Sequence, residues 1–181
     1  MNTGVEGGET ANKLARKWGY IKKGISNNKA RIIFAKGNFW GRTLAAISSS
    51  DDPTSYEGFG PYMPGYDLIP YNNLDALEEE LKDSNVCAFM VEPIQGEGGV
   101  REVPTFCLEA IRKLCDENEV LLIFDEVQCG MGRTGKMFAY QWSNIVAVIM
   151  TIAKAIGNGF PIGACLTSKK VGEIPITFHE N

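Results

Sequence analysis

Three ionisable residues each stand directly after an apolar run in this sequence of 181 residues. Glu92 ends VCAFMVE, Asp125 ends VLLIFD, and Lys154 follows VIMTIA. Carboxylates and an amine can transfer protons, and a lysine amine can also add to a carbonyl carbon as a nucleophile. One such residue is often only the first solvated position after a strand, and an acid beside a lysine can be a plain ion pair. Three on successive strands favour one shared site, because the carboxyl ends of parallel strands meet at one edge of a sheet.

The same residue types meet the needs of one cofactor, pyridoxal 5′-phosphate. Its aldehyde requires a lysine amine, for which Lys154 is available, and its ring nitrogen requires a carboxylate, for which Asp125 is available. Its phosphate requires backbone amides at a helix N-terminus, and the segment Thr3–Val5 begins the first predicted helix. Phe39 and Val127 are candidates to pack on the two faces of the ring.

A glycine motif in the second half of the chain offers a different reading. Gly130, Gly132 and Gly135 follow an apolar strand and spell G-x-G-x-x-G, which by itself suggests a dinucleotide site. Such a site also needs an acid about 20 residues further on for the ribose. No acidic residue occurs between Glu126 and Glu173, and KMFAYQWSN makes a poor amphipathic helix. The dinucleotide reading is therefore disfavoured.

The elements that must position these residues alternate between strand and helix. The strands are continuous apolar runs, which is typical of a parallel sheet with both faces covered, so we predict an α/β fold. Thr3 and Glu6 form the S/T-x-x-E pattern of a capping box at the first helix. The predicted strands are 31–37, 86–94, 120–127, 145–151 and 162–168, and the predicted helices are 6–19, 74–84 and 105–119.

Residues 51–73 form a long stretch with four prolines and three glycines. We predict an irregular loop there, and a loop of this length inside a compact domain is usually functional or part of an interface.

Composition narrows the class of protein. The hydrophobic share of 44% and the charged share of 22% are ordinary for a globular domain, and the net charge of −4 argues against a nucleic-acid partner. Five scattered cysteines without a C-x-x-C pair, and the single histidine His179, predict no metal site and a reducing compartment. No apolar run approaches the ~20 residues that span a bilayer, and no signal peptide is evident. We expect a cytoplasmic domain without a membrane partner.

Five segments resemble the class III aminotransferases, which are fold type I pyridoxal phosphate enzymes. In chain order they are TGVEGGETA, GNFWGRT, VEPIQGEGGV, LLIFDEVQCGMGRTGK and AKAIGNGFPIGA, and they span nearly the whole chain. The segment FWGRTLAAISSSDDPTSYEGFGPYMPGYDLIPYN is most similar to the ornithine aminotransferases, and the half from FDEVQCGMGRTGKMFAYQ onward looks somewhat more like the acetylornithine aminotransferases. The resemblance implies a mostly parallel sheet flanked by helices whose last strand, 162–168, runs antiparallel.

The resemblance also assigns cofactor-binding roles to individual residues. It implies that Lys154 forms the imine with the cofactor and shuttles the proton, and that Asp125 pairs with the pyridine nitrogen. Gln128 bonds the ring hydroxyl, Val127 packs under the ring, and Phe39 stacks on its other face.

Further roles concern the phosphate and the substrate. The resemblance implies that Gly4–Val5 supplies amides to the phosphate and that Arg42 holds a substrate carboxylate. Glu97 contacts the substrate or screens a second arginine, Trp40 forms pocket wall, and Glu92 is a supporting acid whose alternative is a simple strand-end residue.

The implied reaction moves the side-chain amino group of ornithine to 2-oxoglutarate, giving glutamate semialdehyde and glutamate. Acetylornithine or another ω-amino acid is the alternative donor.

The resemblance implies a homodimer through the large domain. Because family members are longer, residues 1–181 are expected to be part of the cofactor-binding large domain, without the N-terminal segment and the small domain, which leaves a mitochondrial location open. The rival hypothesis is a truncated, non-catalytic chain that binds cofactor or associates with a complete subunit.

Overall fold

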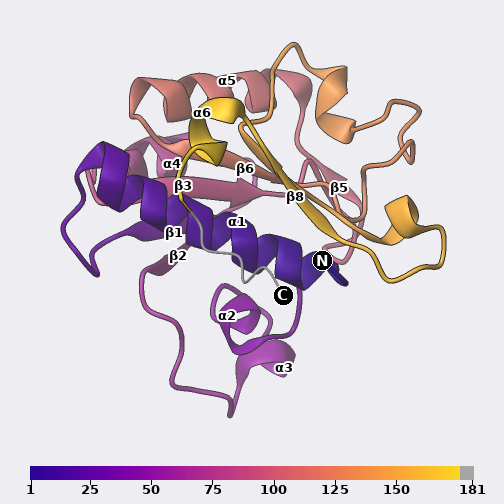
Figure 1. Cartoon of the computed structure of the whole chain (residues 1–181), viewed down its shortest axis with the longest axis horizontal. Coiled ribbons are helices and arrows are strands. Elements are labelled where there is room, and N and C mark those ends of the chain that lie inside the picture. The colour runs from indigo at the N-terminus through magenta and orange to yellow at the C-terminus, as the bar shows by residue number, and fades with distance from the viewer. Residues whose placement is uncertain (176–181) are drawn as a thin grey trace.

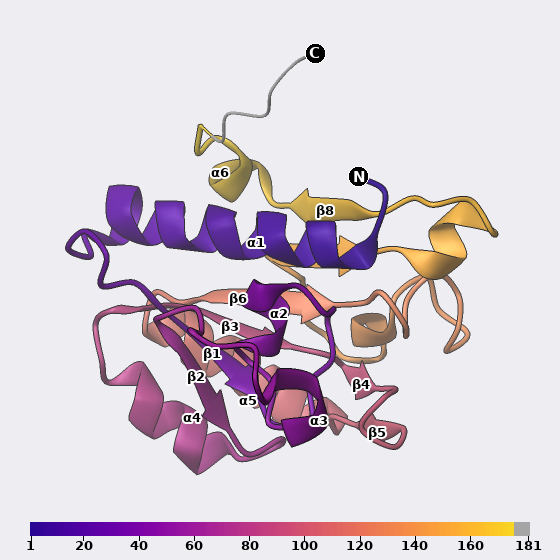
Figure 2. The ribbon, with the colours of Figure 1, turned by 90° about the horizontal axis from the view of Figure 1, so that it is seen from below.

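The computed structural model describes residues 1–175, in which a six-stranded sheet carries helices on both faces (Figures 1 and 2). In this sheet the last strand pairs antiparallel with its neighbour and the other four pairs are parallel, so the predicted α/β class and the antiparallel final strand are confirmed. His179 lies outside the described residues. In sheet order the strands are β2 Tyr66–Ile69, β1 Arg31–Ala35, β3 Val86–Val91, β6 Leu121–Asp125, β7 Ile149–Ile152 and β8 Ala164–Thr167.

Helices cover the two faces unequally. The long helix α1, Gly4–Trp18, runs along one face, while α4, Leu74–Leu81, and α5, Thr105–Glu117, cover the other (Figure 2). Two buried apolar clusters result, one on each face, and β3 is buried at every position. The remaining elements are short: the π-helical turn Gly19–Lys23, α2 Leu44–Ile47, α3 Pro53–Tyr56, β4 Ile94–Gln95, β5 Arg101–Glu102, the 3₁₀ turns Ala139–Trp142 and Lys154–Gly157, and α6 Lys169–Gly172.

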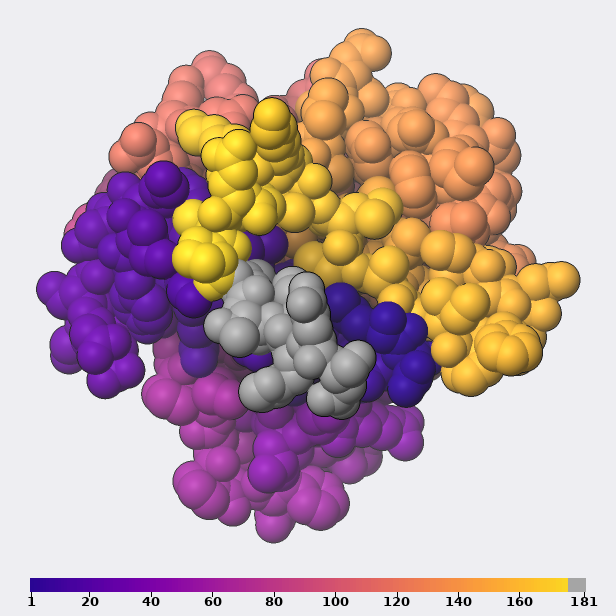
Figure 3. All heavy atoms as spheres, viewed as in Figure 1, coloured from indigo at the N-terminus to yellow at the C-terminus, as the bar shows by residue number. Residues whose placement is uncertain are grey.

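The predicted capping box fixes the start of α1. The Thr3 side chain accepts a hydrogen bond from the Glu6 amide at 3.4 Å, and the Glu6 carboxylate accepts one from the Thr3 amide at 2.7 Å. The preceding residues lie against the chain after β7 (Figure 3), where the Gly163 amide donates to the Met1 carbonyl at 2.8 Å. The helix N-terminus is therefore held against the segment that carries Lys154.

The prediction of an irregular loop over 51–73 was wrong in part. Residues 53–56 form α3, and residues 66–69 form β2, which pairs with β1 at the sheet edge. β2 has only four residues, and they pair only with β1. Gly65 and Pro70 flank the strand, so its sequence does not show the pattern that predicts a strand. All five predicted strands are shorter in the structure. The largest differences are at 86–94, which ends at Val91, and at 145–151, which begins at Ile149.

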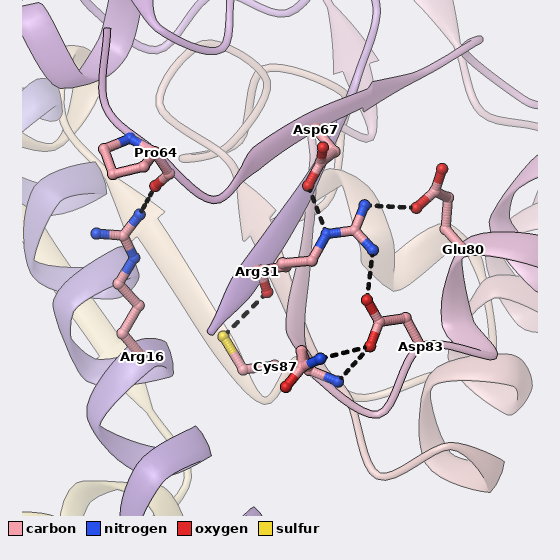
Figure 4. A network of polar contacts seen from close by, with 8 residues as sticks. Arg16, Arg31, Pro64, Asp67, Glu80, Asp83 and Cys87 are labelled. Atoms are coloured by element: carbon pink, nitrogen blue, oxygen red, sulfur yellow. Dashed lines mark hydrogen bonds and ion pairs between the residues drawn. The ribbon is translucent and has the colours of Figure 1, made fainter. Parts of the chain in front are cut away.

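An arginine surrounded by three carboxylates joins β1 to its neighbours (Figure 4). Arg31 donates to Asp67 at 2.9 Å, to Asp83 at 2.8 Å and to Glu80 at 2.8 Å. Asp67 lies in β2, while Glu80 and Asp83 lie at the end of α4 and just beyond it. A backbone hydrogen bond from Asn85, together with Arg31, holds the pKa of Asp83 below its usual range. The cluster therefore ties the edge strand and α4 to the start of β1.

Replacing Arg31 by methionine should destabilise the fold. The substitution leaves three carboxylates facing one another, and the side chain is only partly exposed, so we expect a loss of about 1–3 kcal/mol in the free energy of unfolding. Urea unfolding measures this loss. The matched control is Lys113→Met, which removes one exposed ion pair with Glu117 at 3.7 Å and should cost at most about 0.5 kcal/mol. Equal losses in the two variants would contradict the role of the cluster.

Candidate functional site

The three strand-end residues lie at one edge of the sheet, as predicted. Asp125 is the last residue of β6, Glu92 directly follows β3, and Lys154 lies two residues after the end of β7. These strands are parallel neighbours in the order β3, β6, β7. Their carboxyl ends therefore present two acids and one amine side by side.

A cavity of about 380 Å³ opens at this edge. It collects side chains and backbone from the start of α1, the chain after β1, and the loops after β6 and β7. The residues predicted for the site that line it are Gly4, Val5, Phe39, Trp40, Val127 and Lys154. The others lie beside the cavity without lining it: Glu92, Glu97, Asp125, Gln128 and Arg42.

Asp125 is buried, with 4% of its surface exposed. Its Oδ1 accepts hydrogen bonds from the Val127 amide at 3.0 Å and from Thr151 Oγ1 at 3.1 Å, whereas Oδ2 accepts none from residues 1–175. Burial raises the pKa of Asp125, and these hydrogen bonds and the charge of Lys154 oppose that rise. A buried carboxyl of this kind is well placed to pair with a cation or an N–H donor.

Thr151 is a site residue that the sequence reasoning missed. It lies in β7 directly opposite Asp125 in β6 and is fully buried. The available signal was a polar residue inside an apolar strand, and its hydroxyl fixes which oxygen of Asp125 stays free.

Lys154 has a backbone conformation that L-residues rarely adopt. Its φ angle is 49°, in the left-handed region, and its side chain is exposed beside the cavity. Residues with such φ values cost energy and cluster at functional sites. The turn after β7 therefore carries strain at a residue that lines the cavity.

Phe39 connects the cavity to two predicted site residues. Its amide donates to Glu92 Oε1 at 3.0 Å, and the Arg42 guanidinium lies over its ring, 5.6 Å from the centroid. Arg42 itself lines a neighbouring cavity of about 620 Å³. Glu92 thus anchors the backbone of Phe39, and Arg42 lies at the border of the two cavities.

Trp40 lines the cavity, as predicted, and is also a residue of the buried core. It is buried, its ring stacks on Phe34, and its Nε1 donates to Ser49 Oγ at 2.7 Å. A Cβ on Gly8 would lie 2.5 Å from the Trp40 ring, so α1 packs directly on it. Only part of the indole reaches the cavity.

Gln128 and Glu97 pair with each other. Gln128 Nε2 donates to Glu97 Oε1 at 3.0 Å, and the Gln128 side chain packs so closely on Gly96 that no Cβ would fit there. This contact joins the loop after β6 to the loop between β4 and β5.

The cavity fits the cofactor that the sequence predicts. The amides of Gly4 and Val5 donate to no acceptor in the described part of the chain, and they lie at the N-terminus of a 15-residue helix, which favours an anion. A Cβ on Gly4 would lie 2.9 Å from Val127 Cγ1, so glycine lets the helix start approach the wall. The cofactor also needs apolar ring contacts, an amine and a carboxylate. These are available from Phe39 and Val127, from Lys154, and from the free Oδ2 of Asp125.

Comparison with known proteins gives consistent results. The profile of the class III aminotransferase family matches residues 1–179. The mitochondrial ornithine aminotransferase of Drosophila ananassae is 59% identical over 94% of this chain and 40% of its own length, and that of Rattus norvegicus is 58% identical over 92% and 38%. The acetylornithine aminotransferase 2 of Caulobacter vibrioides is 47% identical over 95% and 42%.

A solved structure shows the same arrangement. The ornithine aminotransferase of Toxoplasma gondii superposes with a TM-score of 0.95 at 45% identity, covering 97% of this chain and 42% of that one. The chain therefore spans about 40% of the length of the curated relatives that it matches.

Two buried carboxyls make the site sensitive to pH. The pKa of Glu92 is raised from 4.5 to about 8, mainly by burial and also by the nearby Asp125, while the hydrogen bond from the Phe39 amide opposes the rise. A raised pKa means that the native chain binds the Glu92 proton more tightly than the unfolded chain does. The contribution of Glu92 to the free energy of unfolding should therefore be fully present below about pH 4.5 and be lost as the pH rises to about 8.

Glu92→Gln should flatten this decline, because glutamine has a similar shape, can still accept from the Phe39 amide and does not titrate. Urea unfolding at about pH 5 and about pH 8 measures the slope. The control is Glu109→Gln, an exposed position on α5, which should retain the wild-type slope. A Glu92→Gln chain that loses stability as steeply as the wild type would contradict the assignment.

Proposed function

This chain belongs to the class III aminotransferase family, and on that premise we propose that it forms part of a pyridoxal 5′-phosphate-dependent aminotransferase. The proposed reaction moves the side-chain amino group of ornithine to 2-oxoglutarate, giving glutamate semialdehyde and glutamate. The observation that carries the proposal is the cavity that joins the start of α1, Phe39, Val127 and Lys154 beside the buried Asp125. In this reading residues 1–181 are a portion of the large, cofactor-binding domain.

Each cofactor-binding residue has a physical task. When bound, the cofactor supplies an aldehyde and an electron-accepting ring. The amides of Gly4 and Val5 would hold its phosphate, Phe39 and Val127 would enclose its ring, and Asp125 would accept a hydrogen bond from its ring nitrogen. A carboxylate beside a protonated nitrogen keeps the positive charge on the ring, because separating the pair in a buried site is costly.

Lys154 has two tasks in the proposal. Its amine would hold the cofactor, because an aldehyde reacts with a lysine amine, and it is also the group that would move a proton from the substrate carbon. The exposed side chain and the strained turn at the cavity opening suit a group that must change partners.

The substrate groups lie on the more open side. Arg42 offers a guanidinium that can hold a carboxylate by two parallel hydrogen bonds, and its stacking on Phe39 keeps it close to the cavity. Glu97, paired with Gln128, is proposed to contact the substrate amine or a second arginine, and Gln128 to bond the ring hydroxyl. Trp40 is proposed to form part of the wall of the substrate pocket.

Ornithine is the proposed donor because relatives at 58–59% identity are named ornithine aminotransferases, whereas the acetylornithine aminotransferase 2 of Caulobacter vibrioides is 47% identical. The oxo acid partner is proposed on the same basis.

The assembly and the compartment are also proposed. We propose a homodimer, with the segment between α2 and β2 as the contact, where Phe59, Tyr62 and Met63 are exposed. The relatives from Drosophila ananassae and Rattus norvegicus are named mitochondrial. We therefore propose either the mitochondrion or the cytoplasm as the location. Within residues 1–175 no helix is long and apolar enough to cross a membrane.

The rival hypothesis is that the chain binds the cofactor or a complete subunit without turning over substrate. Cofactor uptake with no response to ornithine would favour this candidate, and a response to ornithine would favour the enzyme.

Lys154 should be the residue that the cofactor modifies. We expect that pyridoxal phosphate followed by borohydride labels the Lys154 peptide, because Lys154 lines the cavity and is exposed, and that Lys154→Ala abolishes the label. Mass spectrometry of peptides measures it. Lys136→Ala, on the loop between β6 and β7, should keep the label. A label mainly on Lys136 or Lys169 would contradict the assignment.

Asp125→Asn should separate binding from chemistry. Asparagine keeps the shape but loses the charge that stabilises the ring cation, so the half-reaction with ornithine should slow by about 100-fold or more while the cofactor stays bound. The change in absorbance of the bound cofactor measures both, and acetylornithine run in parallel tests the donor. Asp75→Asn, exposed on α4, serves as the control. A variant as fast as wild type would count against the role of Asp125.

A further inference from the structure

Next to Asp125 lies a second buried carboxylate, Glu126, which the proposed chemistry does not use. Only 1% of its surface is exposed, although it follows the last residue of β6. Its own amide donates to the Thr151 carbonyl at 3.0 Å, which continues the strand pairing by one residue. A buried carboxylate is costly unless hydrogen-bond donors surround it, so its partners indicate its purpose.

Both oxygens of Glu126 bind backbone that is distant in sequence. Oε2 accepts from the Ala139 amide at 2.9 Å and Oε1 from the Tyr140 amide at 2.9 Å, and both donors belong to the 3₁₀ turn Ala139–Trp142. The Cys129 thiol donates to Oε2 at 3.3 Å. The carboxylate therefore closes the intervening 127–138 loop on itself.

The loop packs tightly around this carboxylate. The Gly130 amide donates to the Glu126 carbonyl at 2.9 Å, and a Cβ on Gly130 would lie 2.7 Å from that carbonyl oxygen and 3.2 Å from Oε2. On the other side, the Tyr140 ring stacks on Phe124 with centroids 5.6 Å apart. The loop thus has little freedom to shift as long as the Glu126 contacts hold.

Two proposed cofactor-binding residues depend on this closure. Val127 and Gln128 lie between Asp125 and Cys129, so they are fixed at one end by the strand and at the other by the Cys129 and Gly130 contacts. Val127 lines the cavity and donates to Asp125, and Gln128 reaches Glu97.

We propose that Glu126 is a positioning residue whose buried carboxylate clamps the 127–138 loop onto the Ala139–Trp142 turn and so holds Val127 and Gln128 at the cofactor cavity. The inference rests on the proposed function for the part that concerns the cofactor. The loop clamp itself rests on the contacts alone.

The chemistry of the clamp predicts that glutamine cannot replace glutamate. The Ala139 amide, the Tyr140 amide and the Cys129 thiol all donate to the carboxylate oxygens of Glu126. In Glu126→Gln, the side-chain NH₂ would replace one of these oxygens and would face a donor instead of accepting from it. Burial raises the pKa of Glu126, whereas the Tyr140 and Ala139 amides lower it, so these donors favour the charged form that accepts from both. Glu126→Gln keeps a similar shape but has one acceptor oxygen fewer, so we expect the loop to open in this variant.

The test compares two variants that weaken the clamp from opposite sides with one control. Glu126→Gln removes an acceptor, and Gly130→Ala pushes the loop away from the carboxylate. Glu109→Gln, exposed on α5, makes the same chemical change without a buried partner. In the 181-residue chain, amide hydrogen exchange measures the loop, and a pyridoxal phosphate titration followed by absorbance measures affinity.

We expect both variants to exchange residues 127–142 at least about 10-fold faster than wild type, because the local opening free energy falls. Protection in β1 and β3 should persist, and cofactor affinity should fall by about 10-fold, with the control unchanged.

Wild-type exchange in the loop of Glu126→Gln would overturn the clamp, as would loss of protection throughout the sheet in both variants. Faster loop exchange with unchanged cofactor affinity would overturn the positioning role. A wild-type chain that takes up no cofactor would instead overturn the proposed function, and the exchange data would then decide the clamp by themselves.

Discussion

The parallel register of β3, β6 and β7 is the constraint on which the site depends. Because these strands are neighbours and run the same way, their last residues must meet at one edge, and the sequence places Glu92, Asp125 and Lys154 there. Apolar clusters on both faces hold the strands in that register. The site is therefore a consequence of the core: any change that slipped β6 against β7 would also remove Thr151 from Asp125.

Burying acids at that edge is unfavourable, and the fold offsets the cost with backbone donors. Glu92 receives the Phe39 amide, Asp125 the Val127 amide, and Glu126 two amides from one turn. In each case the carboxylate fixes a piece of chain that would otherwise be a free loop. The same hydrogen bonds that stabilise the charges thus shape the cavity, which is why loops without regular structure can carry a precise site.

The sequence predicted the central strands well because continuous apolar runs leave few alternatives, and the capping box predicted the start of α1. It did not predict β2, since four residues at an edge carry almost no pattern. Among site residues, the strand-end positions followed from the sheet alone, and the resemblance supplied Gln128 and Arg42. The roles of Thr151 and Glu126 stayed hidden, because each depends on a contact with a residue 13 or more positions away.

Exposure separates two kinds of group at this edge. Glu92, Asp125 and Glu126 are at most 5% exposed, and each is held by backbone amides, so each keeps one position. Lys154, Arg42 and Glu97 are exposed, and their side chains are free to exchange one partner for another. A transfer reaction needs both: fixed charges that set the electrostatics before the reactants arrive, and movable groups that follow them. The boundary between the two sets runs along Phe39, whose amide binds buried Glu92 and whose ring carries exposed Arg42. Phe39 therefore connects exposed Arg42 to buried Glu92 across the wall of the cavity.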